Sequence, residues 1–179
     1  PTMIDAIIAV EDEDFWTNDW LDYLWIVRAI LHNVQMELGM REDAWWASTI
    51  TQQLVRNLLL TRDRTVVRKL KERILTRRLN EVIENDVIKR YGNITALELQ
   101  TNKKERIMER YLKYMFGWNN NYGIEATSQS YFWKPSKELN ILESAILASI
   151  PKWPSKYEPY NPSNRKNLMW DLAITNRWE

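Results

Sequence analysis

The chain has 179 residues and a formal net charge of +1, and 45% of its residues are hydrophobic. This length fits one domain with a substantial core, and the hydrophobic fraction is too high for a disordered chain. The sequence contains no cysteine and one histidine, His32. Disulfides, thiolate zinc sites and cysteine nucleophiles are therefore excluded, and a serine–histidine catalytic pair is implausible.

Helical periodicity runs through the sequence and no segment alternates with period two, which predicts an all-α domain. The expected helices, in chain order, cover residues 3–10, 22–36, 48–60 with Ser48 as N-cap, 64–90 ended by Gly92, a short helix capped by Thr95 and Glu98, 103–116, 124–132, 138–150 ended by Pro151, and a last helix from residue 162. The clearest turn covers residues 118–123. The expected apolar face of the longest helix consists of Val67, Leu70, Ile74, Leu75, Leu79 and Val82.

Charge is segregated along the chain. Residues 1–22 contain seven acidic side chains and no Lys or Arg, whereas residues 56–78 contain nine basic side chains against Asp63 and Glu72. An acidic end can hold a cation or act as a base, and a basic segment can hold phosphates. Two oppositely charged, solvated faces would give the same pattern.

Tryptophans cluster in the first third of the chain, where Trp16, Trp20, Trp25, Trp45 and Trp46 all fall within residues 16–46. An indole ring suits a membrane–water interface because its ring is apolar while its N–H stays hydrated. We therefore expect residues 16–46 to face a membrane surface, with ordinary core packing as the alternative. No bilayer-spanning run or signal peptide is visible, and we expect an excised domain that is soluble or peripheral.

Two polar blocks carry candidate catalytic groups. Glu11 ends an apolar helix and is followed by further acidic residues. Crowded carboxylates raise one another's pKa, and a carboxylate with a raised pKa can serve as a general base. An exposed acidic turn would have the same sequence. The block 48–53 opens an apolar helix with hydroxyls, amides and backbone N–H groups, which together suit an anion or a sugar. Arg56 and Arg64 lie just downstream, within reach of the same anion.

A third block places Arg68 and Glu72 one helical turn apart, with Lys69 beside them. The spacing fits a surface ion pair of small energy. It also fits a carboxylate held among cations at a diphosphate or metal site.

The three blocks Glu11-Asp12-x-x-Phe15, Ser48-Thr49-Ile50-Thr51-Gln52-Gln53 and Arg68-Lys69-x-x-Glu72 resemble, in order and spacing, those of a known family. The family is the glycosyltransferase module of class A penicillin-binding proteins and the monofunctional peptidoglycan glycosyltransferases. A fourth block from Lys104 to Tyr111 and the segments 122–132 and 139–157 extend the resemblance over nearly the whole chain.

The resemblance implies a lysozyme-like fold over residues 1–179 and polymerisation of lipid II into glycan strands. Glu11 would be the general base for the acceptor 4-hydroxyl, and undecaprenyl diphosphate would leave with inversion. Glu72 would be the second catalytic residue, supporting the diphosphate directly or through Mg²⁺ or Mn²⁺, with no organic cofactor. The implied substrate-binding residues are Asp12, Phe15, Arg28, Ser48, Thr49, Gln52, Gln53, Arg56, Arg64, Arg68 and Lys69.

The implied partners are lipid II, the growing glycan strand and a membrane surface, and not nucleic acid. The implied location is the extracytoplasmic face of the bacterial plasma membrane. Three glycines of the family pattern read as Trp20, Trp46 and Trp133, and an extra segment lies near residues 85–101. A tryptophan would strain the backbone wherever the glycine sits at positive φ.

Two alternatives follow from these departures and from the paired carboxylates. The chain could be an inactive or engineered scaffold that at most binds lipid-linked substrate or the phosphoglycolipid inhibitor moenomycin. It could also be a lysozyme-type glycan hydrolase. The cation-rich stretch argues against a hydrolase, which has no diphosphate to hold.

Overall fold

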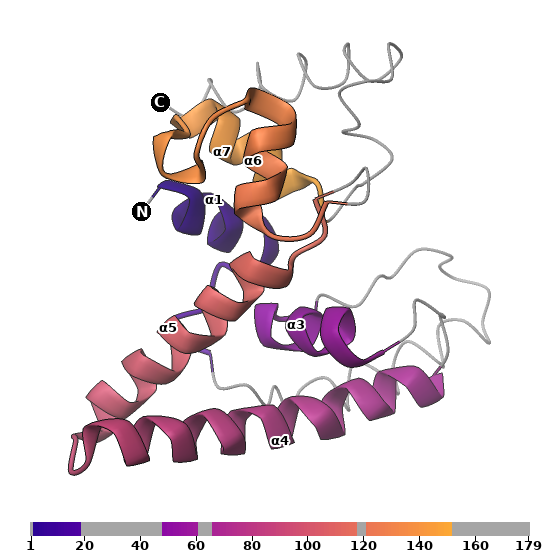
Figure 1. The fold of residues 1–179 in the computed structure, drawn as a ribbon. Coiled ribbons are helices and arrows are strands. Elements are labelled where there is room, and N and C mark those ends of the chain that lie inside the picture. Colours follow the sequence, from indigo (N-terminus) through magenta and orange to yellow (C-terminus); the bar gives the residue numbers. More distant parts are fainter. Residues whose placement is uncertain (1, 19–47, 61–65, 118–120, 152–179) are drawn as a thin grey trace.

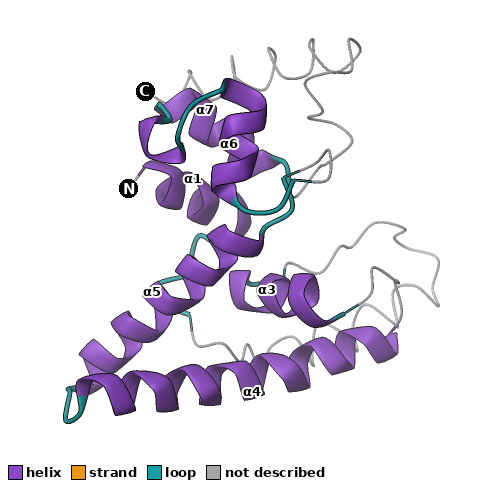
Figure 2. Ribbon diagram, in the orientation of Figure 1, coloured by secondary structure: helices purple, strands orange, loops and turns teal. Residues whose placement is uncertain are grey.

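The fold, in a computed structural model, is described for residues 2–18, 48–60, 66–117 and 121–151. These residues form six α-helices and one 3₁₀ helix and no β-strand (Figure 2). Their bounds are α1 Thr2–Glu11, α3 Ile50–Leu59, α4 Val66–Tyr91, α5 Ala96–Tyr114, α6 Ile124–Phe132, η1 Ser136–Glu138 and α7 Ile141–Ser149. The architecture confirms the predicted all-α, lysozyme-like class. The helices expected at 22–36 and from 162 lie outside the described residues.

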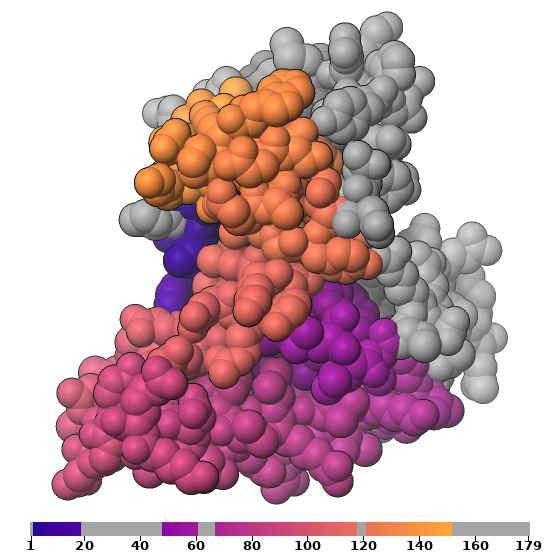
Figure 3. Space-filling model, viewed as in Figure 1, coloured from indigo at the N-terminus to yellow at the C-terminus, as the bar shows by residue number. Residues whose placement is uncertain are grey.

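The long helix α4 forms the base of the molecule, and α5 turns back from its end and rises to the group formed by α1, α6 and α7 (Figure 1). The short helix α3 lies between α5 and α4 and packs on both. Helices α1 and α7, although far apart in sequence, pack against each other. The space-filling view shows the surfaces of α5 and α3 adjoining above α4 (Figure 3).

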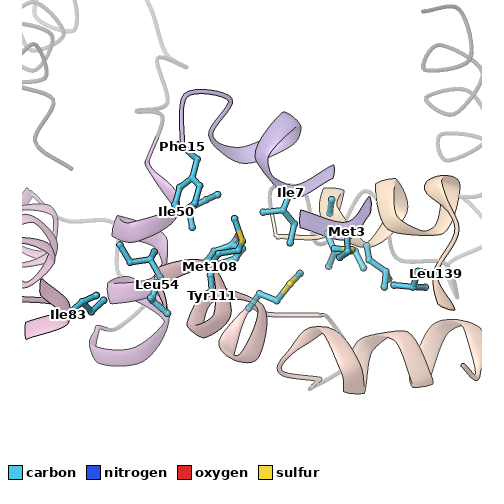
Figure 4. Close-up of a cluster of buried hydrophobic side chains, with 14 of the residues drawn as sticks. Met3, Ile7, Phe15, Ile50, Leu54, Ile83, Met108, Tyr111 and Leu139 are labelled. Atoms are coloured by element: carbon cyan, nitrogen blue, oxygen red, sulfur yellow. The ribbon is translucent and has the colours of Figure 1, made fainter. Parts of the chain in front are cut away.

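A continuous apolar core joins these helices (Figure 4). It runs from Met3 and Ile7 in α1, through Ile50 and Leu54 in α3, to Met108 in α5. Burial of each such side chain contributes about 1.5–3 kcal/mol. The core therefore fixes the end of α1 against α3 and α5, which is where the first two polar blocks meet.

The helix ends differ in detail from the sequence predictions. The N-cap of α3 is Thr49, whose hydroxyl accepts from the Gln52 N–H at 3.3 Å, and not Ser48. The predicted capping box of Thr95 and Glu98 is present, but it opens one continuous helix in place of two, because no glycine or proline interrupts residues 96–114. The last described helix, α7, begins only at Ile141, after η1.

The apolar positions expected along α4 face the core only in part. Leu75 and Leu79 are partly buried, and Leu79 packs against the core. The other four are exposed: Val67, Leu70, Ile74 and Val82. The inward positions of α4 begin with the polar Glu72, Thr76 and Asn80 and become apolar only at Ile83 and Val87. Thr76 donates to the Glu72 carbonyl at 2.7 Å and Asn80 to the Thr76 carbonyl at 2.9 Å, so two of these polar side chains are satisfied within the helix. Local hydrogen bonds thus let α4 bury a polar face.

Candidate active site

Glu11 is the last residue of α1, and its carboxylate meets α3 and, through it, α5. The Gln53 Nε2 of α3 donates to Glu11 Oε2 at 2.6 Å and to the Ser48 carbonyl at 3.2 Å. The Tyr111 hydroxyl of α5 donates to Gln53 Oε1 at 3.1 Å. Gln53 and Tyr111 are both buried, so Glu11 is held from the core side by a buried amide.

Asp12 joins the turn after α1 to the start of α3. Its Oδ2 accepts from the Ile50 N–H at 3.0 Å, and its Oδ1 accepts from the Asn18 amide at 2.8 Å. Burial raises the pKa of Asp12, while the Ile50 N–H and the nearby Lys104 charge act in the opposite direction. Lys104 in turn donates to the Asn18 carbonyl and side-chain oxygens, both at 2.7 Å. Asp12 therefore fixes the position of its neighbour Glu11.

Glu72 is fully buried on the inward face of α4, and both of its carboxylate oxygens accept from cations. Arg68 donates to Oε2 at 2.6 Å and Lys69 to Oε1 at 2.5 Å. Burial lowers the pKa of Lys69, and the hydrogen bond and charge of Glu72 partly offset that effect. The predicted pair of Arg68 and Glu72 is thus a buried cluster and not a surface ion pair.

Ser48 connects the two carboxylate groups. Its carbonyl accepts from Gln53, the partner of Glu11, and its hydroxyl accepts from Lys69 at 2.6 Å, the partner of Glu72. One residue therefore lies between a carboxylate that could take a proton and cations that could hold a leaving anion. This arrangement can perform substitution at a carbon that bears a phosphate leaving group.

The other predicted residues take different places. Arg56, in the last turn of α3, is half-buried, and its charge acts on both Lys69 and Tyr111. Thr49 caps α3, and Gln52 is buried with its Oε1 lacking a hydrogen-bond partner within the described residues. Phe15 packs in the core, with Lys104 4.9 Å from its ring centroid, so its ring contacts protein. Arg28 and Arg64 lie outside the described residues.

Comparison with known proteins shows which family the chain belongs to. Residues 1–176 match the protein family described as Transglycosylase. The chain belongs to the transglycosylase family. This membership confirms the resemblance seen in the sequence and places the chain among the peptidoglycan glycosyltransferase enzymes.

Three similar proteins illustrate the extent of the match. Penicillin-binding protein 1A of Aquifex aeolicus (strain VF5) is 37% identical over 171 residues, which is 93% of this chain and 20% of that protein. Penicillin-binding protein 2D of Bacillus subtilis (strain 168) is 37% identical over 160 residues, which is 89% of this chain and 20% of that protein. Penicillin-binding protein 1A of Haemophilus influenzae is 38% identical over 174 residues, which is 97% of this chain and 18% of that protein. The chain spans about a fifth of the length of these relatives.

Sequence reasoning gave no role to Tyr111, Lys104 or Asn18, although all three hold the site. Lys104 begins and Tyr111 ends the fourth transglycosylase block, and their spacing of seven positions places the two side chains on one face of a helix. The spacing was the available signal. The partners that they contact, far away in sequence, could not be read from it.

The residues around Glu72 do not fit a metal ion held by the protein. Both oxygens of Glu72 already accept from Arg68 and Lys69, and no group of three metal-binding side chains occurs in the described ranges. A divalent ion in a transglycosylase of this geometry would have to arrive with a diphosphate, as part of the substrate.

One of the three glycine-to-tryptophan departures lies in the described part of the chain. Trp133 follows α6 in the left-handed conformation, with φ 55° and ψ 30°, and its side chain is 81% exposed. The expected backbone strain is therefore present, but the ring points to solvent and away from the core. Trp20 and Trp46 lie outside the described residues. Within the described helices, none is both long and apolar enough to cross a bilayer.

Proposed function

We propose that this transglycosylase domain polymerises lipid II into glycan strands, with Glu11 as the general base and undecaprenyl diphosphate as the leaving group. The observation that carries the proposal is the position of Ser48 between the Glu11–Gln53 pair and the Lys69–Glu72 pair. The proposed proton acceptor Glu11 and the cation Lys69 thus lie on opposite sides of Ser48.

On the acceptor side, Glu11 takes the proton from the 4-hydroxyl of one sugar while that oxygen attacks the anomeric carbon of the other. The hydrogen bond from Gln53 fixes the carboxylate in one orientation. A positioned base of this kind contributes about 10²- to 10⁴-fold in rate.

On the donor side, the bond between the anomeric carbon and the diphosphate oxygen breaks, and its electron pair leaves with that oxygen. Two cations, Arg68 and Lys69, share the single carboxylate of Glu72, which leaves a net positive charge to meet the diphosphate. Arg56 adds to it, since its charge reaches Lys69. Cations fixed in advance stabilise a developing anion without reorganisation. Mg²⁺ or Mn²⁺ bound to the diphosphate would supplement this charge.

The same two cations argue against a glycan hydrolase. A retaining or inverting hydrolase needs a second carboxyl group that donates a proton to the leaving oxygen. In Glu72 both oxygens instead accept from cationic side chains, which suits a carboxylate that organises positive charge. Transfer from a diphosphate uses this arrangement, whereas hydrolysis of a glycoside does not.

The proposal places the domain at the extracytoplasmic face of the bacterial plasma membrane, where a lipid-linked diphosphate would be available. Membrane contact would come from residues 16–46. Of the tryptophans in that segment, Trp16 lies in the described part and is 42% exposed.

The test is a lipid II polymerisation assay in detergent with Mg²⁺, comparing the parent chain with Glu11→Gln. The expected result is polymer from the parent and a loss of at least about 100-fold in the variant, because an amide cannot accept the proton. Glu13→Gln, which changes an exposed neighbouring carboxylate, is the matched control and should keep the parent rate.

Circular dichroism should give the same helical spectrum for the three proteins. Full activity in Glu11→Gln would contradict the assignment of the base. Binding of lipid II or moenomycin without any polymer from the parent would indicate an inactive scaffold. Release of soluble fragments from purified cell walls would indicate a hydrolase.

A further inference from the structure

We propose that Tyr111 is a positioning residue for the base Glu11, acting through the side-chain amide of Gln53. The inference rests on the proposed role of Glu11. The contacts form a chain: the Tyr111 hydroxyl donates to Gln53 Oε1 at 3.1 Å, and Gln53 Nε2 donates to Glu11 Oε2 at 2.6 Å.

The direction of this chain is fixed by its surroundings. Besides Glu11, the Gln53 amide nitrogen contacts the Ser48 carbonyl, at 3.2 Å, and a carbonyl can only accept a hydrogen bond. The nitrogen of the amide must therefore face Ser48 and Glu11, and its oxygen must face Tyr111. In the flipped orientation the amide oxygen would oppose two acceptor oxygens. Tyr111 consequently acts as a donor here.

The hydroxyl of Tyr111 is not needed to fill space. Tyr111 is 0% exposed and belongs to the apolar core, where a phenylalanine ring would occupy nearly the same volume. A buried hydroxyl costs free energy unless it is hydrogen-bonded, and this one is bonded to Gln53. Burial raises the pKa of Tyr111, and the negative charge of Glu11 adds to that effect, so the phenol keeps its proton at neutral pH.

A second chain of contacts runs from the same helix to Asp12, the residue that follows Glu11. Lys104, seven residues before Tyr111 on α5, donates to Asn18, and Asn18 donates to Asp12. Two adjacent residues of the site, Glu11 and Asp12, are each tied to α5 by one intermediate amide. Helix α5 therefore acts as the common support for the base and for the turn that follows it.

The experiment measures steady-state polymerisation by Tyr111→Phe across a range of pH. We expect kcat to fall about 10- to 100-fold with KM within about twofold, because a displaced base slows the reaction without weakening substrate binding. We also expect the acid limb of the kcat profile to move to higher pH, because a less firmly held Gln53 stabilises the Glu11 carboxylate less. Tyr114→Phe, one turn further along α5 and exposed, is the matched control and should match the parent in both readouts.

A second pair of variants keeps the test decisive if Tyr111→Phe folds poorly. Gln53→Met removes the amide at similar length and should shift the acid limb in the same direction. Adding Tyr111→Phe to Gln53→Met should cost no further kcat, because the chain is already broken. Thermal unfolding of each variant checks that the folded protein is compared.

The outcomes separate the two levels of the proposal. If Glu11→Gln is inactive while Tyr111→Phe keeps the parent kcat and pH profile, the role of Tyr111 is overturned and the base assignment stands. Tyr111→Phe could instead lower kcat without moving the acid limb, and could lower kcat by the same factor when added to Gln53→Met. That result would mean that Tyr111 has only a structural role. If Glu11→Gln is fully active, the proposed function fails and the positioning role fails with it.

Discussion

Glu72 shows how burial changes the meaning of a charged pair. On sequence spacing alone, Arg68 and Glu72 could have been an exposed i,i+4 pair of small energy. The structure buries the carboxylate completely and bonds each oxygen to a cation. The site therefore depends on Glu72 for the placement of two side chains, and its removal would take away the carboxylate that both cations share.

We expect Glu72→Gln to lower the free energy of unfolding by about 2–3 kcal/mol, because it weakens two charge-assisted hydrogen bonds at a buried position. The same helix provides a control in the exposed pair of Arg77 and Glu81, joined at 3.0 Å. Glu81→Gln should cost less than about 0.5 kcal/mol. Urea denaturation measures both, and equal losses would mean that burial of the Glu72 cluster adds nothing.

Trp133 is a case of the opposite kind, because its backbone conformation is unfavourable and its exposed side chain gains little packing in return. A left-handed residue costs an L-amino acid with a bulky side chain about 1–2 kcal/mol, which glycine avoids. Because the ring is 81% exposed, its removal forfeits little packing.

We expect Trp133→Gly to raise the free energy of unfolding by about 1 kcal/mol, once the larger freedom of glycine in the unfolded chain is subtracted. Trp133→Asn should gain less, since asparagine tolerates this conformation only in part. Thermal or urea unfolding gives the answer. A loss of stability in both variants would show that the exposed ring packs on something essential.

At the scale of the element, the ends of the helices are set by short-range chemistry. The capping box of Thr95 and Glu98 starts α5, and that of Asn140 and Glu143 starts α7. In both capping boxes a glutamate carboxylate accepts a hydrogen bond from the backbone N–H of the cap residue. The Thr95 N–H and hydroxyl lower the pKa of Glu98, and the Lys134 ammonium lowers that of Glu143.

This capping makes stability depend on pH in a defined direction. The pKa of Glu98 is lower in the folded protein than its ordinary value of 4.5, so the unfolded chain binds the proton more tightly. Its contribution is complete above pH 4.5 and is lost as pH falls through the lowered value. Glu98→Ala should therefore be less stable than the parent at pH 7, and the difference should narrow below pH 4. Denaturation at both pH values measures this, and a constant difference would contradict it.

At the scale of the whole molecule, some features could be read from the sequence and others could not. Helix positions followed periodicity and end signals, so α6 and the capping box of α5 matched their predictions. The three blocks located Glu11, Ser48 and Lys69, which the fold brings together. The apolar spacing of α4 did not reveal its buried polar residues, because spacing cannot show that a polar face satisfies its own hydrogen bonds. The contact between Gln53 and Tyr111 was out of reach, because it joins residues 58 positions apart.

The packing of α1 on α7 adds a further long-range dependence. Ile7 of α1 and Leu147 of α7 belong to the same buried cluster, although nearly the whole described chain separates them. Glu11 stands at the end of α1, so the position of the site depends on the last described helix as well as on the blocks near it. A family block near the start of the sequence is thus held in place by apolar residues of α7, more than a hundred positions away.

Ser48 sets the spacing between the two halves of the site with a single residue. Its carbonyl accepts a hydrogen bond from Gln53 of α3, and its hydroxyl accepts one from Lys69 of α4. A slide of α3 along α4 would therefore draw the Ser48 hydroxyl away from Lys69 while the Ser48 carbonyl stayed with Gln53, so the Glu11 side of the proposed site would move relative to the Glu72 side. If the proposed mechanism holds, the backbone at Ser48 sets the distance between the base and the cations. An insertion or deletion beside Ser48 would change that distance, whereas exchanging either glutamate would not.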